Sequence, residues 1–287
     1  MKAQARQSFL RALELDPNNT SAMPNFSILE VRHGRLDEAA CWGRRLFPLS
    51  GKRGNDYHHL AVPFMTLRAD ALSRTVLEAA ERRFPVFPRI QTTLATLELF
   101  EGKDGQAIAR MNAIAAREAQ NEEVRRLRPE FAVLTNSGNL PEALEPLMQY
   151  SASTALALGP TVRLRYAWLL GKREGAARAA PLVAEAERIA RAQIDAGSEE
   201  ARVRIEMAGA AALRKDPAAA LDWLSRAYDT GYRDFVFLAR DPIFGELHSN
   251  PRFGAILDRI RNDVAAQRRR AEQRGLLRVD DLLTPSK

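Results

Sequence analysis

Small, aromatic and polar residues alternate along the chain at helical spacing. In the first 17 residues, Ala5, Phe9 and Ala12 follow one another at offsets of four and three, so that they share one face of a helix. Pro17 ends this helix because it has no amide N–H to donate. Short stretches containing glycine or proline separate the later segments of the same kind. The pattern predicts a globular, helical protein.

The pattern returns at steps of about 34 residues. Further units begin at Thr20, Gly54 and Pro88, and a fifth begins at Val124 after a two-residue slip. Each unit is expected to hold two helices joined by a left-handed turn, for which glycine is suited. The turn positions carry Gly34, Arg68, Gly102 and Gly138. The second helices carry small residues that allow close packing, namely Ala39, Ala80, Ala107 and Ala143.

This arrangement of small, aromatic and turn residues resembles the tetratricopeptide (TPR) repeat. The resemblance implies an all-α, right-handed superhelical solenoid of antiparallel helix pairs. Residues 1–157 form the part in clear register, with an incomplete first unit. Residues 158–232 read as degenerate pairs, with helices at 163–170 and 176–194 around a GKREG turn, and then at 199–214 and 216–229. Residues 233–287 are expected to hold a capping segment, an Arg-rich C-terminal helix and a frayed end.

One string in the last part resembles the segment that closes TPR arrays in bacterial signalling proteins. It consists of Asp241, Pro242, Phe244, Leu247, Pro251, Arg252 and Phe253. Such relatives carry the array behind a winged-helix, adenylate cyclase or Ser/Thr kinase domain, and the sequence contains none of these. Because the first unit supplies only its second helix, either another element covers its apolar face or the chain is a fragment of a longer regulatory protein. We expect the fragment.

The residues that carry chemistry do not assemble into a catalytic or metal-binding motif. Cys41 is the single cysteine, which excludes an intramolecular disulfide framework and a cysteine-built zinc site. The adjacent pair His58–His59 points in directions about 100° apart on a helix and lacks a matching carboxylate. The sequence also lacks phosphate-binding glycine loops and nucleophile elbows. We therefore predict no enzymatic activity, no metal and no cofactor.

Charge gives a weaker indication of the partner. The formal net charge is +7, and 37 of the 43 basic residues are arginines. The basic residues gather in two clusters: Arg125, Arg126 and Arg128, and then Arg259, Arg261, Arg268, Arg269, Arg270 and Arg274. Residues 254–287 contain no aromatic side chain on which a base could stack, which argues against nucleic-acid binding. No apolar run approaches the roughly 20 residues of a membrane span, and a cytoplasmic location is expected.

The resemblance also suggests where a partner binds, because the first helix of each TPR unit lines the concave surface. The matching positions hold Asn25, Asn55, His58, His59, Arg89, Thr92, Arg125 and Arg128. These side chains make a polar, mildly basic face suited to an extended or acidic peptide. Asn25 stands at a position typical of the chaperone-binding clamp, but the accompanying basic residues are missing.

We therefore predict a non-enzymatic protein–protein interaction scaffold or sensor module that binds a protein or peptide. The alternatives are the regulatory part of a transcription regulator, cyclase or kinase, and a nucleic-acid-binding protein acting through its basic helices.

Overall fold

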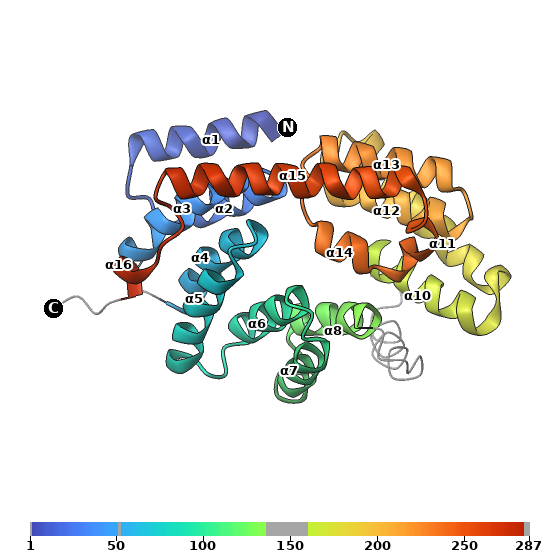
Figure 1. The fold of residues 1–287 in the computed structure, drawn as a ribbon, viewed down its shortest axis with the longest axis horizontal. Helices are drawn as coiled ribbons and strands as arrows, with labels where there is room; N and C mark the ends of the chain where they lie inside the picture. Colours follow the sequence, from blue (N-terminus) through green and yellow to red (C-terminus); the bar gives the residue numbers. More distant parts are fainter. Residues whose placement is uncertain (1, 51–52, 136–159, 284–287) are drawn as a thin grey trace. The chain divides into compact units, whose positions relative to one another are not determined.

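The computed structural model describes residues 2–50, 53–135 and 160–283, and all regular structure within these ranges is helical (Figure 1). The helices alternate as first and second members of antiparallel pairs. The first helices are α2 (Ala22–Arg32), α4 (Gly54–Thr66), α6 (Pro88–Phe100), α8 (Glu122–Leu134), α10 (Pro160–Glu174) and α12 (Ala201–Leu213). The second helices are α1 (Lys2–Leu15), α3 (Leu36–Leu49), α5 (Asp70–Arg83), α7 (Asp104–Arg117), α11 (Ala176–Asp195) and α13 (Pro217–Asp229).

The left-handed turns confirm the repeat register. Gly34 and Gly102 have φ of 70° and 76°, and Arg68, which replaces the expected glycine, has φ of 60°. Two of the expected starts, Gly54 and Pro88, are the first residues of α4 and α6. The predictions for Gly138, Ala143 and a boundary after residue 157 concern positions outside the described residues.

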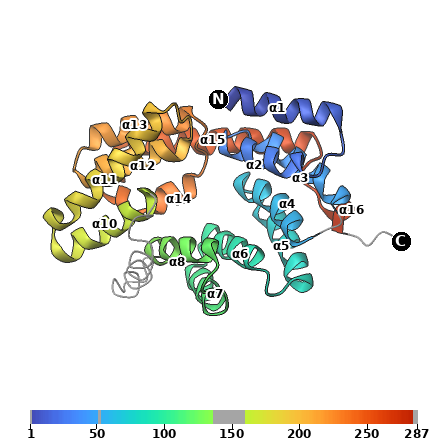
Figure 2. The same ribbon diagram turned by 180° about the vertical axis from the view of Figure 1, so that it is seen from behind.

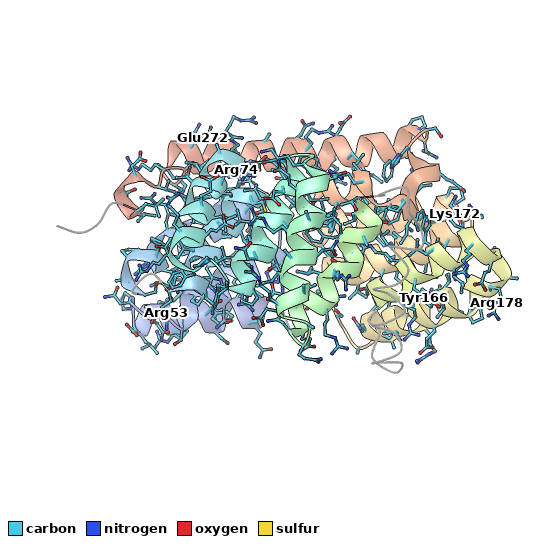
Figure 3. All side chains as sticks on the ribbon, turned by 90° about the horizontal axis from the view of Figure 1, so that it is seen from below. Arg53, Arg74, Tyr166, Lys172, Arg178 and Glu272 are labelled. Carbon is cyan, nitrogen blue, oxygen red and sulfur yellow. The ribbon has the colours of Figure 1, made fainter. Side chains whose placement is uncertain are left out.

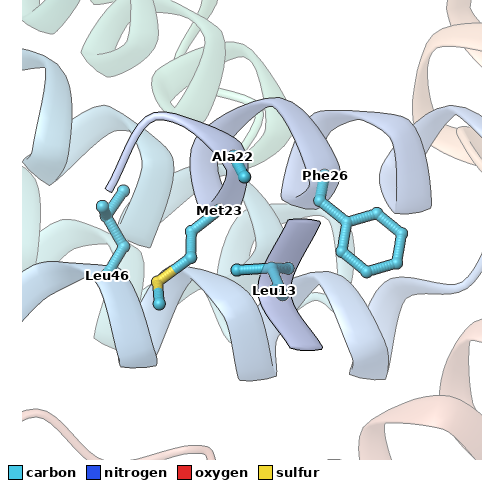
Figure 4. Close-up of a cluster of buried hydrophobic side chains, with 5 residues drawn as sticks. All are labelled: Leu13, Ala22, Met23, Phe26 and Leu46. Carbon is cyan, nitrogen blue, oxygen red and sulfur yellow. The ribbon is translucent and has the colours of Figure 1, made fainter. Parts of the chain in front are cut away.

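The chain divides into two compact units, and α7 and α15 (Pro251–Gln273) contribute residues to both. Unit 1 comprises Met1–Arg110 and Arg261–Lys287, and unit 2 comprises Met111–Ile260. In unit 1, α1, α2 and α3 share a buried cluster formed by Leu13, Ala22, Met23, Phe26 and Leu46 (Figure 4).

The alanines predicted for close packing are fully buried. Ala39, Ala80 and Ala107 each have no exposed surface, which fits their small side chains to the contact between paired helices. Buried carboxylates recur as well. Glu30 pairs with Arg6 at 3.0 Å, and Glu98, two repeat lengths further on, pairs with Arg110 at 2.9 Å. Each of these two buried carboxylates therefore has an arginine that compensates its charge.

The Arg-rich second half of α15 packs against the turns of unit 1. Gln267 accepts the N–H of Leu36 at 2.6 Å and donates to the carbonyl of Gly34 at 2.8 Å, so it caps α3 from more than 230 residues away. Arg268 donates to the carbonyl of Arg68 at 2.6 Å, and Arg270 pairs with Asp37 at 2.9 Å.

The segment after α15 is also held in place. The expectation of a frayed end is wrong for residues 276–283, because Val279 and Leu282 are buried. Arg44 of α3 pairs with Asp281 at the start of α16 (Asp280–Leu283).

Unit 2 contains the pairs α10–α11 and α12–α13, whose members lie side by side in both views (Figures 1 and 2). The expected GKREG turn is wrong in extent. Gly171 lies inside α10, and the chain turns only at Gly175, whose φ is 92°. The start of α13 is confirmed, since Asp216 accepts the N–H of Ala219 ahead of Pro217.

After α13 come the short helix α14 (Phe235–Arg240) and the 3₁₀ segment η1 (Pro242–Leu247), which leads to α15. Phe244, Leu247 and Phe253 of the closing string are buried, as a capping role requires. On the outside of both units, long charged side chains such as Arg178 and Glu272 project from the helices (Figure 3).

Candidate interaction surface

Close backbone packing places the polar positions of α4 and α6 beside one another. Gly54 begins α4 without a side chain, and a Cβ there would lie 2.9 Å from the ring of Phe87. Phe87 directly precedes α6, so this contact fixes the start of α6 against the start of α4. As a result, Arg89 Nη1 donates to Asn55 Oδ1 at 3.3 Å, across a separation of one repeat length.

A second contact joins the same two helices one turn further along. His58 Nδ1 lies 2.8 Å from the hydroxyl of Thr93. The rings of His58 and His59 have centroids 5.4 Å apart and are tilted by 74°, so they meet edge to face. Asn55, His58, His59, Arg89 and Thr93 therefore form one polar strip, which we call the first-helix face of unit 1. Within it, Asn55 is exposed, Thr93 is buried and the other three residues are partly buried.

Both imidazoles of this face are neutral at physiological pH. Burial, together with the smaller effects of the neighbouring His59 and Arg89, lowers the pKa of His58 to about 3. The pKa of His59 is lowered by its burial and by Arg89. The two rings consequently offer hydrogen bonds instead of positive charge, and Arg89 is the cation of the strip.

Two predicted residues of unit 1 contribute differently. Asn25 is exposed on α2, and its amide donates to the carbonyl of Ser21 in the same helix at 2.9 Å. Thr92 is only 2% exposed, and its hydroxyl donates to the carbonyl of Arg89 at 3.1 Å. Thr93, its neighbour, makes the contact with His58 instead.

The remaining predicted residues belong to unit 2. Arg125 and Arg128 are half-buried on α8, and Arg128 Nε donates to Asn112 of α7 at 3.2 Å. The structure thus brings the predicted residues of α4 and α6 together, and it places those of α8 in the other unit.

A charged cluster in unit 2 was not found from the sequence. Arg165 of α10 is almost completely buried and bridges two carboxylates, Glu130 of α8 at 3.1 Å and Asp241 ahead of η1 at 3.0 Å. Burial of the nearby Tyr232 raises its pKa, with Asp234 and Asp241 acting in the same direction. The 35-residue step from Glu130 to Arg165 is the signal that could have revealed their contact.

Groups suited to other chemistry stay dispersed in the part of the chain that the structure describes. No set of three or more His, Cys, Asp or Glu there could hold a metal ion. Burial raises the pKa of the Cys41 thiol, which makes it a poorer nucleophile. None of the described helices combines the length and the apolar character needed to cross a membrane.

Comparisons with known proteins bear on the fold. A scan against protein-family models finds no match. A search of curated proteins finds none either. Among solved structures, a tetratricopeptide repeat protein from Parabacteroides merdae matches with a TM-score of 0.54 and 13% identity, over 84% of this chain and 91% of that one. This chain has the TPR fold.

A second structure, the APC/C hetero-tetramer Cut9–Hcn1, matches with a TM-score of 0.58 and 15% identity. The likeness covers 94% of this chain and 52% of the chain it matches, so this TPR chain spans about half of that protein. At these identities the likeness concerns the fold alone. The antiparallel pairs, the left-handed turns and the buried alanines are the local features of this chain that produce it.

Proposed function

We propose that this chain is a non-enzymatic scaffold that binds a protein or peptide partner on its first helices. The observation that carries the proposal is the polar strip across α4 and α6. In this strip, Arg89 contacts Asn55 and Thr93 contacts His58, so that polar side chains of two successive repeats lie next to one another. An extended peptide needs such a series of evenly spaced polar groups, because its own backbone amides recur at regular intervals.

The chemistry of the strip defines the partner further. Two neutral imidazoles and the Asn55 amide can donate to and accept from peptide backbone groups. Arg89 supplies one cation, which suits a carboxylate on the partner. Asn25 on α2 adds to the proposed surface in unit 1, and Arg125 and Arg128 on α8 form a separate part of it in unit 2. A partner with a few acidic residues fits this surface better than one with a high negative charge.

A protein partner is favoured over nucleic acid by the position of the basic side chains. Arg270 and Arg274, from the most basic stretch of the sequence, pair with Asp37 and Glu38 in unit 1 at 2.9 and 2.7 Å. Arg268 donates to the carbonyl of Arg68. These three arginines are engaged in contacts within the array, although their side chains stay 39–52% exposed. A phosphate-binding helix needs cations that are not already paired.

The resemblance of the closing string at residues 241–253 supports a more specific role. We propose that the array serves as a sensing or scaffolding arm in a signalling system, in which partner binding is the input.

The test is capture of partners from a lysate of the source cells, followed by binding measurements with purified partner. Arg89→Glu reverses the cation of the first-helix face of unit 1. Arg82→Glu is the matched control, because Arg82 is exposed on the second helix α5 and the change in net charge is the same. Arg125→Glu/Arg128→Glu tests the part of the surface on α8.

The proposal predicts that Arg89→Glu weakens binding by at least tenfold and that Arg82→Glu leaves it within twofold of the wild type. Far-UV circular dichroism of each variant establishes that the helices are intact. Equal loss of binding in both variants would show that net charge, and not this surface, governs the interaction. A partner that binds Arg89→Glu as well as wild type contradicts the proposed surface.

A further inference from the structure

The segment between α14 and α15 lies against first helices of unit 2. Asp241 pairs with Arg165 of α10, and Ile243 lies next to the position where a side chain on Gly209 of α12 would be. The η1 segment packs against α12 and against α14. First helices are the elements that we propose for partner binding, so in unit 2 the chain itself covers part of that face.

The contact between Asp241 and Arg165, at the start of this segment, resembles the way a bound peptide is held by one charged residue. Arg165 is the sixth residue of α10, the same place that Thr93 holds in α6 and His59 holds in α4. One carboxylate oxygen of Asp241 accepts from Arg165 Nη2 at 3.0 Å, and the other accepts the N–H of Ile243 at 3.1 Å. Asp241 therefore caps the following turn and binds the first-helix face at the same time.

Apolar contacts continue from this anchor. Phe244 and Leu247 are 2% and 4% exposed, and Ile243 is 8% exposed. A Cβ on Gly209 would lie 3.6 Å from Ile243 Cγ2, so a residue without a side chain makes room for the segment on α12. At the far end, Glu246 pairs with Lys215 in the turn between α12 and α13.

The helices beneath the segment also pack against one another. The pairs α10–α11 and α12–α13 pack within themselves, as repeat pairs do. Arg165 also has Glu130 at 3.1 Å, which would hold the guanidinium in place and compensate its charge if Asp241 left.

We propose that Asp241–Leu247 is a built-in ligand, which occupies a peptide-binding site on α8, α10 and α12 in cis. The site takes an acidic residue followed by a short apolar turn, and a partner peptide of that chemistry competes with the internal segment. The inference rests on the proposed function, since it extends partner binding on first helices to unit 2.

The experiment supplies the segment in trans. A fluorescent peptide with the sequence of residues 239–249 is titrated into the full chain and into the variant Asp241→Ala/Phe244→Ala, whose internal segment is weakened. Anisotropy should show at least tenfold tighter binding to the variant than to the wild type, whose site is occupied. The peptide should also raise the melting midpoint of the variant. A peptide carrying Asp241→Lys should bind neither chain.

Two results would overturn the proposal. The first is a helical, cooperatively melting variant that does not bind the peptide, because the segment would then be an integral part of the core. The second applies even if the variant does not fold. Hydrogen exchange of the wild-type chain should show amides of residues 235–247 opening at least tenfold faster than those of α10 and α12, whereas equal protection contradicts a docked ligand.

Failure of this proposal can be distinguished from failure of the proposed function. The probe is the chain's own segment, and the readout does not involve Arg89 or a captured partner. Loss of the proposed surface on α4 and α6 would leave the binding of this peptide unchanged.

Discussion

Gly43 allows α3 to approach α4 more closely than any other residue would. An added Cβ would lie 2.6 Å from the carbonyl oxygen of His59 and 3.5 Å from the Cα of Leu60, both of which are backbone atoms. The carbonyl of His59 faces Pro63 one turn later, and proline has no N–H to hold that oxygen along the helix axis. A side chain at position 43 would thus collide with backbone atoms of α4, which cannot move aside as the end of a flexible side chain can.

The change Gly43→Ala should separate α3 from α4 by about 0.8 Å, the difference between 2.6 Å and an ordinary contact of 3.4 Å. Overpacking of this kind destabilises by about 1–3 kcal/mol, and the backbone on both sides places the site in the upper half of that range. The higher helix propensity of alanine relative to glycine offsets about 1 kcal/mol of this loss. The net loss in the free energy of unfolding is therefore about 1–2 kcal/mol.

Thermal unfolding followed by far-UV circular dichroism measures this effect. We expect a decrease of about 2–8 °C in the melting midpoint of Gly43→Ala. Gly105→Ala is the matched control, because a Cβ there meets nothing within 4 Å and the residue lies in the first turn of α7. The control should be as stable as the wild type or slightly more stable. If Gly43→Ala behaves like the control, the packing of α3 on α4 described above is wrong.

Three further perturbations follow from other parts of the structure. Because burial lowers the pKa of His58 to about 3, well below its ordinary value of about 6.5, the folded state disfavours protonation. The contribution of neutral His58 to the free energy of unfolding is therefore fully present above pH 6.5. It decreases by up to about 1.4 kcal/mol per pH unit as the pH falls towards 3. His58→Gln should flatten the curve of melting midpoint against pH, and parallel curves for the two proteins would contradict this. Gly102→Ala forces a side chain into a turn with φ of 76° and should lower stability by about 1 kcal/mol, whereas Gly105→Ala, in equally open space, should not. Gln267→Ala leaves the buried N–H of Leu36 and the buried carbonyl of Gly34 without their partner. We expect the free energy of unfolding, measured in urea, to fall by about 1–3 kcal/mol. An unchanged urea midpoint would show that the contact of α15 with this turn is dispensable.

The repeat pattern allowed much of the fold to be predicted, because its determinants are local. Gly34 and Gly102 mark left-handed turns, Pro88 starts a helix, and Ala39 and Ala80 mark close helix contacts. Each of these properties follows from one residue and its near neighbours. The turn at residues 171–175 was misjudged because both of its glycines looked alike, and only Gly175 adopts a positive φ.

The parts that sequence reasoning missed depend on contacts between distant residues. Gln267 caps α3 across more than 230 residues, and Arg165 meets Asp241 across 76 residues. Neither pair has a local signal, since glutamine and arginine in a polar helix are ordinary surface residues. The strip on α4 and α6 was partly predictable, because the 34-residue step places Asn55 over Arg89. Its neutral histidines were not, since their pKa values depend on burial in the folded state.

Partner binding on the first helices is the proposal on which the function of this chain depends. The most direct measurement is hydrogen exchange of the wild-type chain with and without its captured partner, read peptide by peptide. We expect bound partner to slow exchange in α4 and α6 and to change exchange in α3 and α5 little. Protection confined to the second helices α3 and α5 would contradict it.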